Sequence, residues 1–385
     1  MAVDDMTVPG PAGAGRLALR SGAMPANRMN RDEFYAAMAP HDDARLRKIL
    51  WTVYWRGNAQ LRERIEDELR PHSQPKVKAR REPPDPVGVL DEVTTFTELA
   101  RDGAYMAGDR RVHHTERSRW RHTFRRLAAD ALAALMASDP GPAQQAVAKI
   151  VDLACEMKTY DYFHSDDPVE AAKFVVSEAV AALWESVLRH DGFAALAGRA
   201  PEQLLRWEAD YGWTRRGDGQ VAQKETLLAV PLARLLTTPD MWRAFAESYL
   251  TALEAAGRAD PGRPRTIWGT FDETSYRRKE RAGDLAAWHE MLLERFAGSP
   301  EDDLLDRLVA SPALAGSELI FLRARIAQRR GDVSQAARLV TRCLEEMPGH
   351  PEYLDFALEV GAELPSRARE IAAERARVAE YLRTT

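Results

Sequence analysis

The sequence lacks the features that hold a small secreted domain together or that span a membrane. It contains only two cysteines in 385 residues, Cys155 and Cys343, so we do not expect a disulfide framework. Both cysteines lie in segments with helical apolar spacing, where a buried thiol behaves as a small hydrophobe. No stretch approaches the roughly eighteen consecutive apolar residues of a transmembrane helix. We therefore expect a cytoplasmic protein without a membrane partner.

Strand-forming segments are also scarce. Runs rich in Val, Ile and Thr are few, whereas Ala, Leu, Arg and Glu fill segment after segment, and these residues favour helices over strands. The length allows two or three domains with hydrophobic cores. The sequence predicts an all-α fold: an α-solenoid-like helical array with a small N-terminal three-helix module.

The N-terminal part divides into three segments. Residues 1–28 are rich in Gly, Ala and Pro and lack the apolar core of a signal peptide, so we expect a disordered tail, with Met24 and Met29 as alternative starts to Met1. Residues 29–70 are predicted to form the three-helix module, which begins at Asn30 with Glu33 as its capping-box partner. Residues 71–86 combine prolines with a run of basic residues, which favours an extended basic linker.

The remainder alternates amphipathic helices with short breaks. Residues 87–256 are predicted to be one α-helical domain, residues 257–268 a linker, and residues 269–385 a second helical domain. Thr115 and Ser165 are the expected N-caps, and the last helix of this domain is expected to be entered at Thr238-Pro239. The main helices predicted between residues 87 and 256 are 87–107, 115–138, one from Pro142, one from Pro168 to His190, 201–211, 223–236 and 239–256.

Two stretches near the C-terminus share one pattern at an offset of 48 positions. Gly283-Asp284 is followed by Pro300, and Gly331-Asp332 by Pro348, with an amphipathic segment between each pair. In the second copy, the small residues Ala324 and Ala336 allow two helices to approach closely. In the first copy, Trp288 occupies the position that matches Ala336.

The second copy, residues 317–350, resembles a tetratricopeptide repeat, whose pattern places small residues at these sites, Gly-Asp at the turn and Pro at the end. The first copy, residues 269–302, departs from that pattern at Trp288. The resemblance implies a helical-repeat domain that binds a protein or peptide in a concave groove, without catalysis. Such repeats need neighbouring units to bury their apolar faces. The alternative is that these helices only pack the domain.

The strongest electrostatic feature is a row of arginines. Arg117, Arg121 and Arg125 follow one another at i, i+4 and i+8 beside the apolar stripe of one helix. Because like charges at this spacing repel, we expect an anion nearby: an acidic part of the chain, an acidic protein or phosphate. Arg110 and Arg111 lie close in sequence, and residues 71–126 hold twelve Lys or Arg against eight Asp or Glu. A nucleic-acid-associated regulator that uses the region 110–126 and the basic linker is therefore an alternative function.

A second candidate contact is the loop with Trp213, Arg215 and Arg216. Aromatic residues beside arginines are typical of binding hot spots, although the same residues could close over the core.

Signs of chemistry are weak. Asp161, His164 and Asp166 have the donor types of a metal site, but they precede Pro168, where a helix N-terminus recruits such residues as caps. His289-Glu290 lacks the second His of a metalloprotease motif. We predict no metal or cofactor and favour a non-enzymatic interaction or scaffold protein. An enzyme whose active site is assembled from distant helices is the second alternative.

Overall fold

The computed structural model describes residues 31–56, 65, 83–106, 109–211, 218–260 and 272–384. Over these residues helices are the only regular secondary structure, which confirms the predicted all-α class. The chain divides into two compact units, unit 1 (residues 1–81) and unit 2 (residues 82–385).

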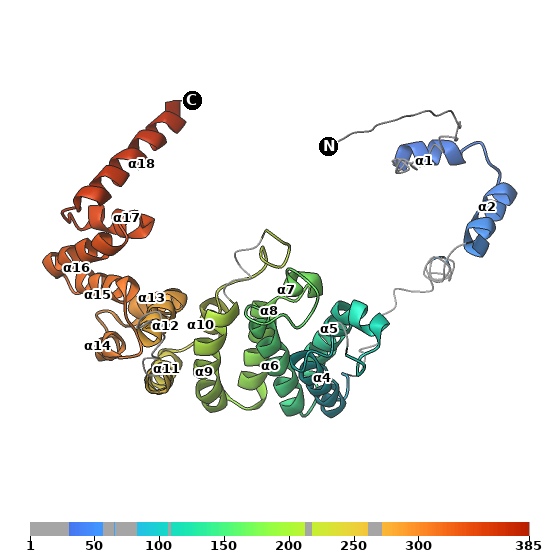
Figure 1. Cartoon of the computed structure of the whole chain (residues 1–385), viewed down its shortest axis with the longest axis horizontal. Coiled ribbons are helices and arrows are strands. Elements are labelled where there is room, and N and C mark those ends of the chain that lie inside the picture. The colour runs from blue at the N-terminus through green and yellow to red at the C-terminus, as the bar shows by residue number, and fades with distance from the viewer. Residues whose placement is uncertain are drawn as a thin grey trace, which may run out of the picture. The chain divides into compact units, whose positions relative to one another are not determined.

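Unit 1 contains α1 (Arg31–Met38) and α2 (Asp43–Arg56) (Figure 1). The carboxylate of Asp42 accepts a hydrogen bond of 2.8 Å from the amide of Arg45, and so caps the start of α2. No residue of α2 is buried. The predicted tail, most of the predicted third helix and most of the basic linker lie outside the described residues.

Unit 2 is a succession of helices (Figure 1), in which many contacts join a helix to the next one or to the next but one, such as α15 with α16, α4 with α6 and α9 with α11. In chain order they are α4 (Pro86–Arg101), α5 (His114–Ala134), α6 (Gly141–Glu156), α7 (Pro168–Ala172), α8 (Val176–His190), α9 (Phe193–Tyr211), α10 (Ala229–Leu235), α11 (Pro239–Ala259), α12 (Glu273–Asp284), α13 (Ala286–Phe296), α14 (Asp303–Ala310), α15 (Ser317–Arg329), α16 (Val333–Glu346), α17 (Pro351–Glu359) and α18 (Ser366–Thr384).

One hydrophobic core runs through most of unit 2, from Val89 in α4 to Ile326 in α15. Its largest fully buried side chains include Trp184, Trp207 and Trp288. A second, smaller core joins α15, α16, α17 and the start of α18, where Ala368 is buried. The apolar stripes that predict these helices therefore also provide the surfaces that hold them together.

The main core continues across the region where the sequence suggests a linker, residues 257–268. Trp242 of α11 stacks on Trp288 of α13, with ring centroids 5.6 Å apart. The hydroxyl of Tyr249 lies 2.7 Å from Nε2 of His289, and both residues are buried. The described helices on the two sides of this region thus share one packed interior.

Some helix boundaries differ from the prediction. The single helix expected from Pro168 to His190 is wrong: α7 ends at Ala172, and Lys173 adopts a left-handed conformation with φ of 54° before α8 begins. The predicted cap Ser165 is also wrong, because the carboxylate of Asp167 accepts the hydrogen bond from the amide of Glu170 at 2.9 Å.

The other corrections are smaller. His113, rather than Thr115, caps α5. The predicted helix 223–236 is shortened to α10, Ala229–Leu235, because the preceding residues 218–228 form an irregular segment held by side chains from other helices. Glu170 accepts from the amide of Val221 and Glu208 from that of Leu228. The predicted helix entry at Thr238-Pro239 is confirmed, and the hydroxyl of Thr238 caps α11 by accepting from the amide of Met241.

Candidate functional site

The arginine row of α5 is satisfied mainly by backbone carbonyls. Nη1 of Arg117 donates to the carbonyl of Met106 at 2.9 Å. Arg125 donates through Nε and Nη2 to the carbonyls of Ala172 and Ala171, at 2.9 and 2.5 Å. These two carbonyls end α7, where the helix dipole concentrates partial negative charge. Two of the three arginines therefore bind an acceptor that the sequence analysis did not consider, instead of a carboxylate or phosphate.

The other predicted contact residues differ in how accessible they are. Arg111 pairs with the carboxylates of Asp102 and Asp109, at 2.7 and 2.9 Å. Arg110 and Arg121 are exposed and form no ion pair with any described residue. Of the five arginines singled out in the sequence, these two remain open to a partner. Trp213, Arg215 and Arg216 lie outside the described residues.

The second repeat copy forms a tight helical hairpin. Gly331 follows α15 with φ of +84°, the left-handed conformation typical of a residue after a helix end. The carboxylate of Asp332 accepts from the amide of Gln335 at 2.8 Å and so caps α16. Ala324 and Ala336 are completely buried. Pro348 comes two residues after the end of α16 and cannot continue it.

The first copy has a different turn. Gly283 and Asp284 are the last residues of α12, and α13 follows after Leu285, which provides no side-chain cap. Trp288 packs against α11 through Trp242, which explains why a large residue fits there. Pro300 follows the end of α13. The shared Gly-Asp sequence thus produces two local geometries.

Charged side chains between α13, α15 and α17 also serve packing. Arg325 pairs with Glu290 at 2.5 Å and with Glu352 at 3.5 Å, and so joins the three helices. Burial raises the pKa of Glu290, although Arg325 opposes this shift. This arrangement is an internal clamp of the C-terminal helices.

Among the described helices, α2 carries the largest group of exposed apolar side chains, and the sequence analysis did not identify it as a site. Trp51 and Trp55 are 59% and 67% exposed. Ile49, Leu50 and Val53 are exposed as well, although their spacing suggests the buried stripe of a three-helix module. The small size of that module could have indicated this exposure. A module of only three short helices is too small to bury apolar residues on opposite faces of one helix.

The apolar residues of α2 occupy two opposite faces. With about 3.6 residues per turn, Ile49, Leu50 and Val53 share one face. Trp51 and Trp55 lie on the other, where Trp51 stacks on Trp55 at 5.8 Å between ring centroids. Exposed basic residues separate the two faces on one side: Arg45, Lys48 and Arg56. We name these surfaces the aliphatic face, the tryptophan face and the basic stripe.

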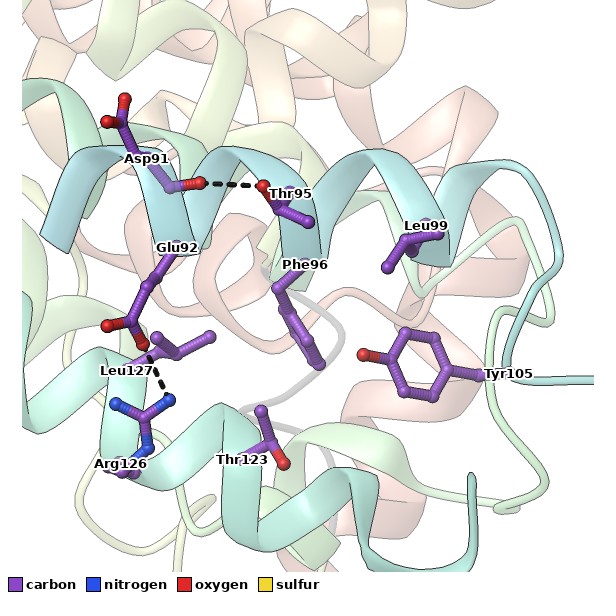
Figure 2. A pocket seen from close by; sticks show the side chains of 9 residues that line it. All are labelled: Asp91, Glu92, Thr95, Phe96, Leu99, Tyr105, Thr123, Arg126 and Leu127. Atoms are coloured by element: carbon purple, nitrogen blue, oxygen red, sulfur yellow. Dashed lines mark hydrogen bonds and ion pairs between the residues drawn. The ribbon is translucent and has the colours of Figure 1, made fainter. Parts of the chain in front are cut away.

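A cleft lies between α4 and α5, with a volume of about 330 Å³ (Figure 2). Phe96, Leu127 and Tyr105 form its apolar floor, and all three are buried. At one end, Nη2 of Arg126 binds Oε2 of Glu92 at 2.8 Å, as the dashed line in Figure 2 shows.

The other end of this cleft holds a phenol. The hydroxyl of Tyr105 points into the cleft (Figure 2) and has no hydrogen-bond partner among the described residues. Burial raises the pKa of Tyr105 to about 12, with a further contribution from Glu116. The sequence alone does not predict that Tyr105 and Arg126 line the same cleft, because the position of Tyr105 depends on the turn that follows α4.

The described residues contain no group of three His, Cys, Asp or Glu placed to hold a metal. Both cysteines are buried and neither forms a disulfide, and burial raises the pKa of Cys343 to about 12, so its thiol is a poor nucleophile. None of the described helices is long and apolar enough to cross a membrane. No protein-family model matches the chain, and comparisons with curated proteins and with solved structures found no match.

Proposed function

We propose that this is a non-enzymatic interaction protein of the cytoplasm, which presents α2 to an acidic protein partner. The observation that carries the proposal is that α2 exposes large apolar side chains on two faces and buries none. Contiguous exposed apolar surface is typical of interaction sites. A helix of 14 residues is also marginal in water without tertiary contacts, so a partner would stabilise it.

The charge of α2 indicates the kind of partner. The helix carries only one acidic residue, Asp43, and four basic residues: Arg45, Arg47, Lys48 and Arg56. An apolar groove with an acidic rim complements both the aliphatic face and the basic stripe. A nucleic acid would use the basic stripe and stack on the tryptophans, but it would leave Ile49, Leu50 and Val53 in water. The aliphatic face therefore favours a protein.

Unit 2 supports the same function. Its C-terminal hairpin, α15 and α16, has the turn and the small residues of the tetratricopeptide-like pattern, and repeats of that kind bind polypeptides. This analogy concerns the fold and is weaker support than the surface of α2.

Two neighbouring positions on α2 provide a matched test. Val53→Gln removes an apolar side chain from the aliphatic face, whereas Thr52→Gln changes an exposed polar residue beside it. Full-length protein is immobilised, incubated with an extract of the native host, and the retained proteins are quantified by mass spectrometry. Loss of a large apolar contact weakens binding about tenfold or more. We expect an acidic protein that the wild type and Thr52→Gln retain and that Val53→Gln and Trp55→Gln lose. Equal retention by all four proteins would refute the proposal.

The nucleic-acid alternative has a separate test, since Arg110 and Arg121 remain open. Fluorescence anisotropy measures binding of the full chain to labelled single-stranded and duplex DNA and RNA at low and physiological salt. Affinity that falls steeply with salt, and that is lost in Arg110→Glu/Arg121→Glu, would favour the regulator.

A further inference from the structure

The floor of the α4–α5 cleft is built to receive one large apolar group. Phe96 packs edge-on against Phe124, with centroids 6.0 Å apart, and tilts against Tyr105 at 5.2 Å. These aromatic contacts hold the floor in place. A volume of about 330 Å³ is at the small end of the range for ligand sites, roughly 300–1,000 Å³. The cleft therefore has room for a single side chain and little more.

The end of the cleft near Arg126 has an excess of negative charge. Arg126 is shared between Glu92 and Asp130, at 2.8 and 3.1 Å. Asp91 lines the cleft, is exposed, and forms no ion pair with a described residue. Two carboxylates thus share one guanidinium, and Asp91 adds a third negative charge to the lining, so this end has a net negative charge that complements a cation.

The opposite end offers a hydrogen-bond donor. The hydroxyl of Tyr105 is unpartnered among the described residues and directed into the cleft (Figure 2). It is protonated at neutral pH, as any phenol with the ordinary pKa of about 10 is, and burial raises this pKa further, to about 12. A carbonyl oxygen is the natural acceptor for such a phenol.

We propose that this cleft binds a polypeptide segment which inserts one aromatic or branched apolar side chain. A neighbouring Lys or Arg of that segment pairs with the carboxylates of Asp91 and Glu92. A backbone carbonyl of the segment accepts a hydrogen bond from the hydroxyl of Tyr105. A polypeptide supplies the apolar group, the cation and the carbonyl together. The site lies in unit 2 and does not depend on the function proposed for α2.

The test uses a phage-displayed library of random linear peptides selected on the full-length protein. Thr123→Trp fills the cleft, and Thr251→Trp adds the same side chain to an exposed position of α11 as its control. Selected peptides are expected to carry an aromatic or branched residue near Lys or Arg. Their affinity should fall about tenfold or more for Thr123→Trp and stay unchanged for Thr251→Trp.

Two milder variants separate the contributions and do not alter the packing of the floor. Tyr105→Phe should weaken peptide binding about two- to tenfold, and Asp91→Asn by up to about fivefold. Replacing the Lys or Arg of a selected peptide by Glu should weaken it further.

Other results would overturn the proposal. The first is that the selected peptides bind the variants Thr123→Trp, Tyr105→Phe and Asp91→Asn as tightly as they bind the wild type. Another is a preference for acidic peptides. A third is binding of free L-tryptophanamide as tight as that of the best peptide, since this would make the site one for small amines.

Discussion

Asp260 is the centre of a buried ionic clamp at the end of α11. Its carboxylate accepts from Nη2 of Arg281 at 2.8 Å and from Nε of Arg278 at 3.2 Å, and its side chain is only 3% exposed. Arg281 also donates to the carbonyl of Ala313 at 2.8 Å. The clamp therefore fastens α11 to α12 and to the turn before α15.

Removing this carboxylate should lower the free energy of unfolding substantially. Asp260→Ala leaves two guanidinium groups without their anion, and breaking a buried ion pair costs roughly 3–5 kcal/mol. Arg278 is about one-third exposed and regains some hydration, so we expect about 2–4 kcal/mol. Asp260→Asn keeps one acceptor oxygen and should lose about 1–2 kcal/mol.

Urea unfolding followed by tryptophan fluorescence measures these changes, because Trp242 and Trp288 lie in the same core. Asp240→Ala is the control: its carboxylate also pairs with an arginine of α11, Arg243 at 2.7 Å, but it is 87% exposed. An exposed pair contributes about 1 kcal/mol or less. A loss below about 1 kcal/mol for Asp260→Ala, equal to that of the control, would refute the clamp.

The same clamp predicts a pH dependence. Burial raises the pKa of Asp260, but hydrogen bonds and charge from Arg281 and Arg278 outweigh it and lower the pKa below its ordinary value. The contribution of this carboxylate to stability is therefore complete above the unfolded pKa of about 3.9. It is lost as the pH falls through the folded pKa. The difference between wild type and Asp260→Asn should be constant near neutral pH and shrink below about pH 4.

Three further predictions concern the packing of unit 2. Gly257→Ala should lower the melting temperature despite the better helix propensity of Ala, since the added Cβ would lie 2.8 Å from another side chain. Gly198→Ala should raise the melting temperature, because nothing lies within 4 Å of its added Cβ. Calorimetry of the two variants measures both changes. Tyr249→Phe should cost about 1–3 kcal/mol in urea unfolding, because it leaves the buried ring nitrogen of His289 unpaired; no change would show that the bond is dispensable. Cys343 should not react with a disulfide reagent at pH 8 until urea unfolds the protein, because burial raises its pKa to about 12; rapid native reaction would contradict this.

Helical periodicity was sufficient to predict the class of the fold and most of its helices. Apolar residues at helical spacing form a stripe on one side of a helix, and this stripe is buried when the helix packs against its neighbours. The helix entry at Thr238-Pro239 followed from a local signal, since Pro239 fits the first turn. Local sequence failed at Lys173, where no Gly or Pro marks the break. That residue is left-handed although its sequence is compatible with a continuous helix.

The surfaces were harder to predict than the helices. The row of Arg117, Arg121 and Arg125 was recognised, but two of its members bind carbonyls 11 and 46–47 residues away, and sequence spacing does not report such contacts. Similarly, Gly283-Asp284 and Gly331-Asp332 have the same sequence, but only the second pair forms the left-handed turn. The neighbours of each segment decided its geometry. The partner-binding roles of these residues stay predictions.

The core that continues from α11 to α13 has a practical consequence for dividing the protein. Trp242 and Tyr249 lie before the region 261–271, and their contacts Trp288 and His289 lie after it. Two polypeptides that end and begin in this region would each expose an aromatic surface that matches the other. The chain is therefore suited to being divided in this region: we expect the two fragments to be poorly soluble alone and to reassemble when co-expressed.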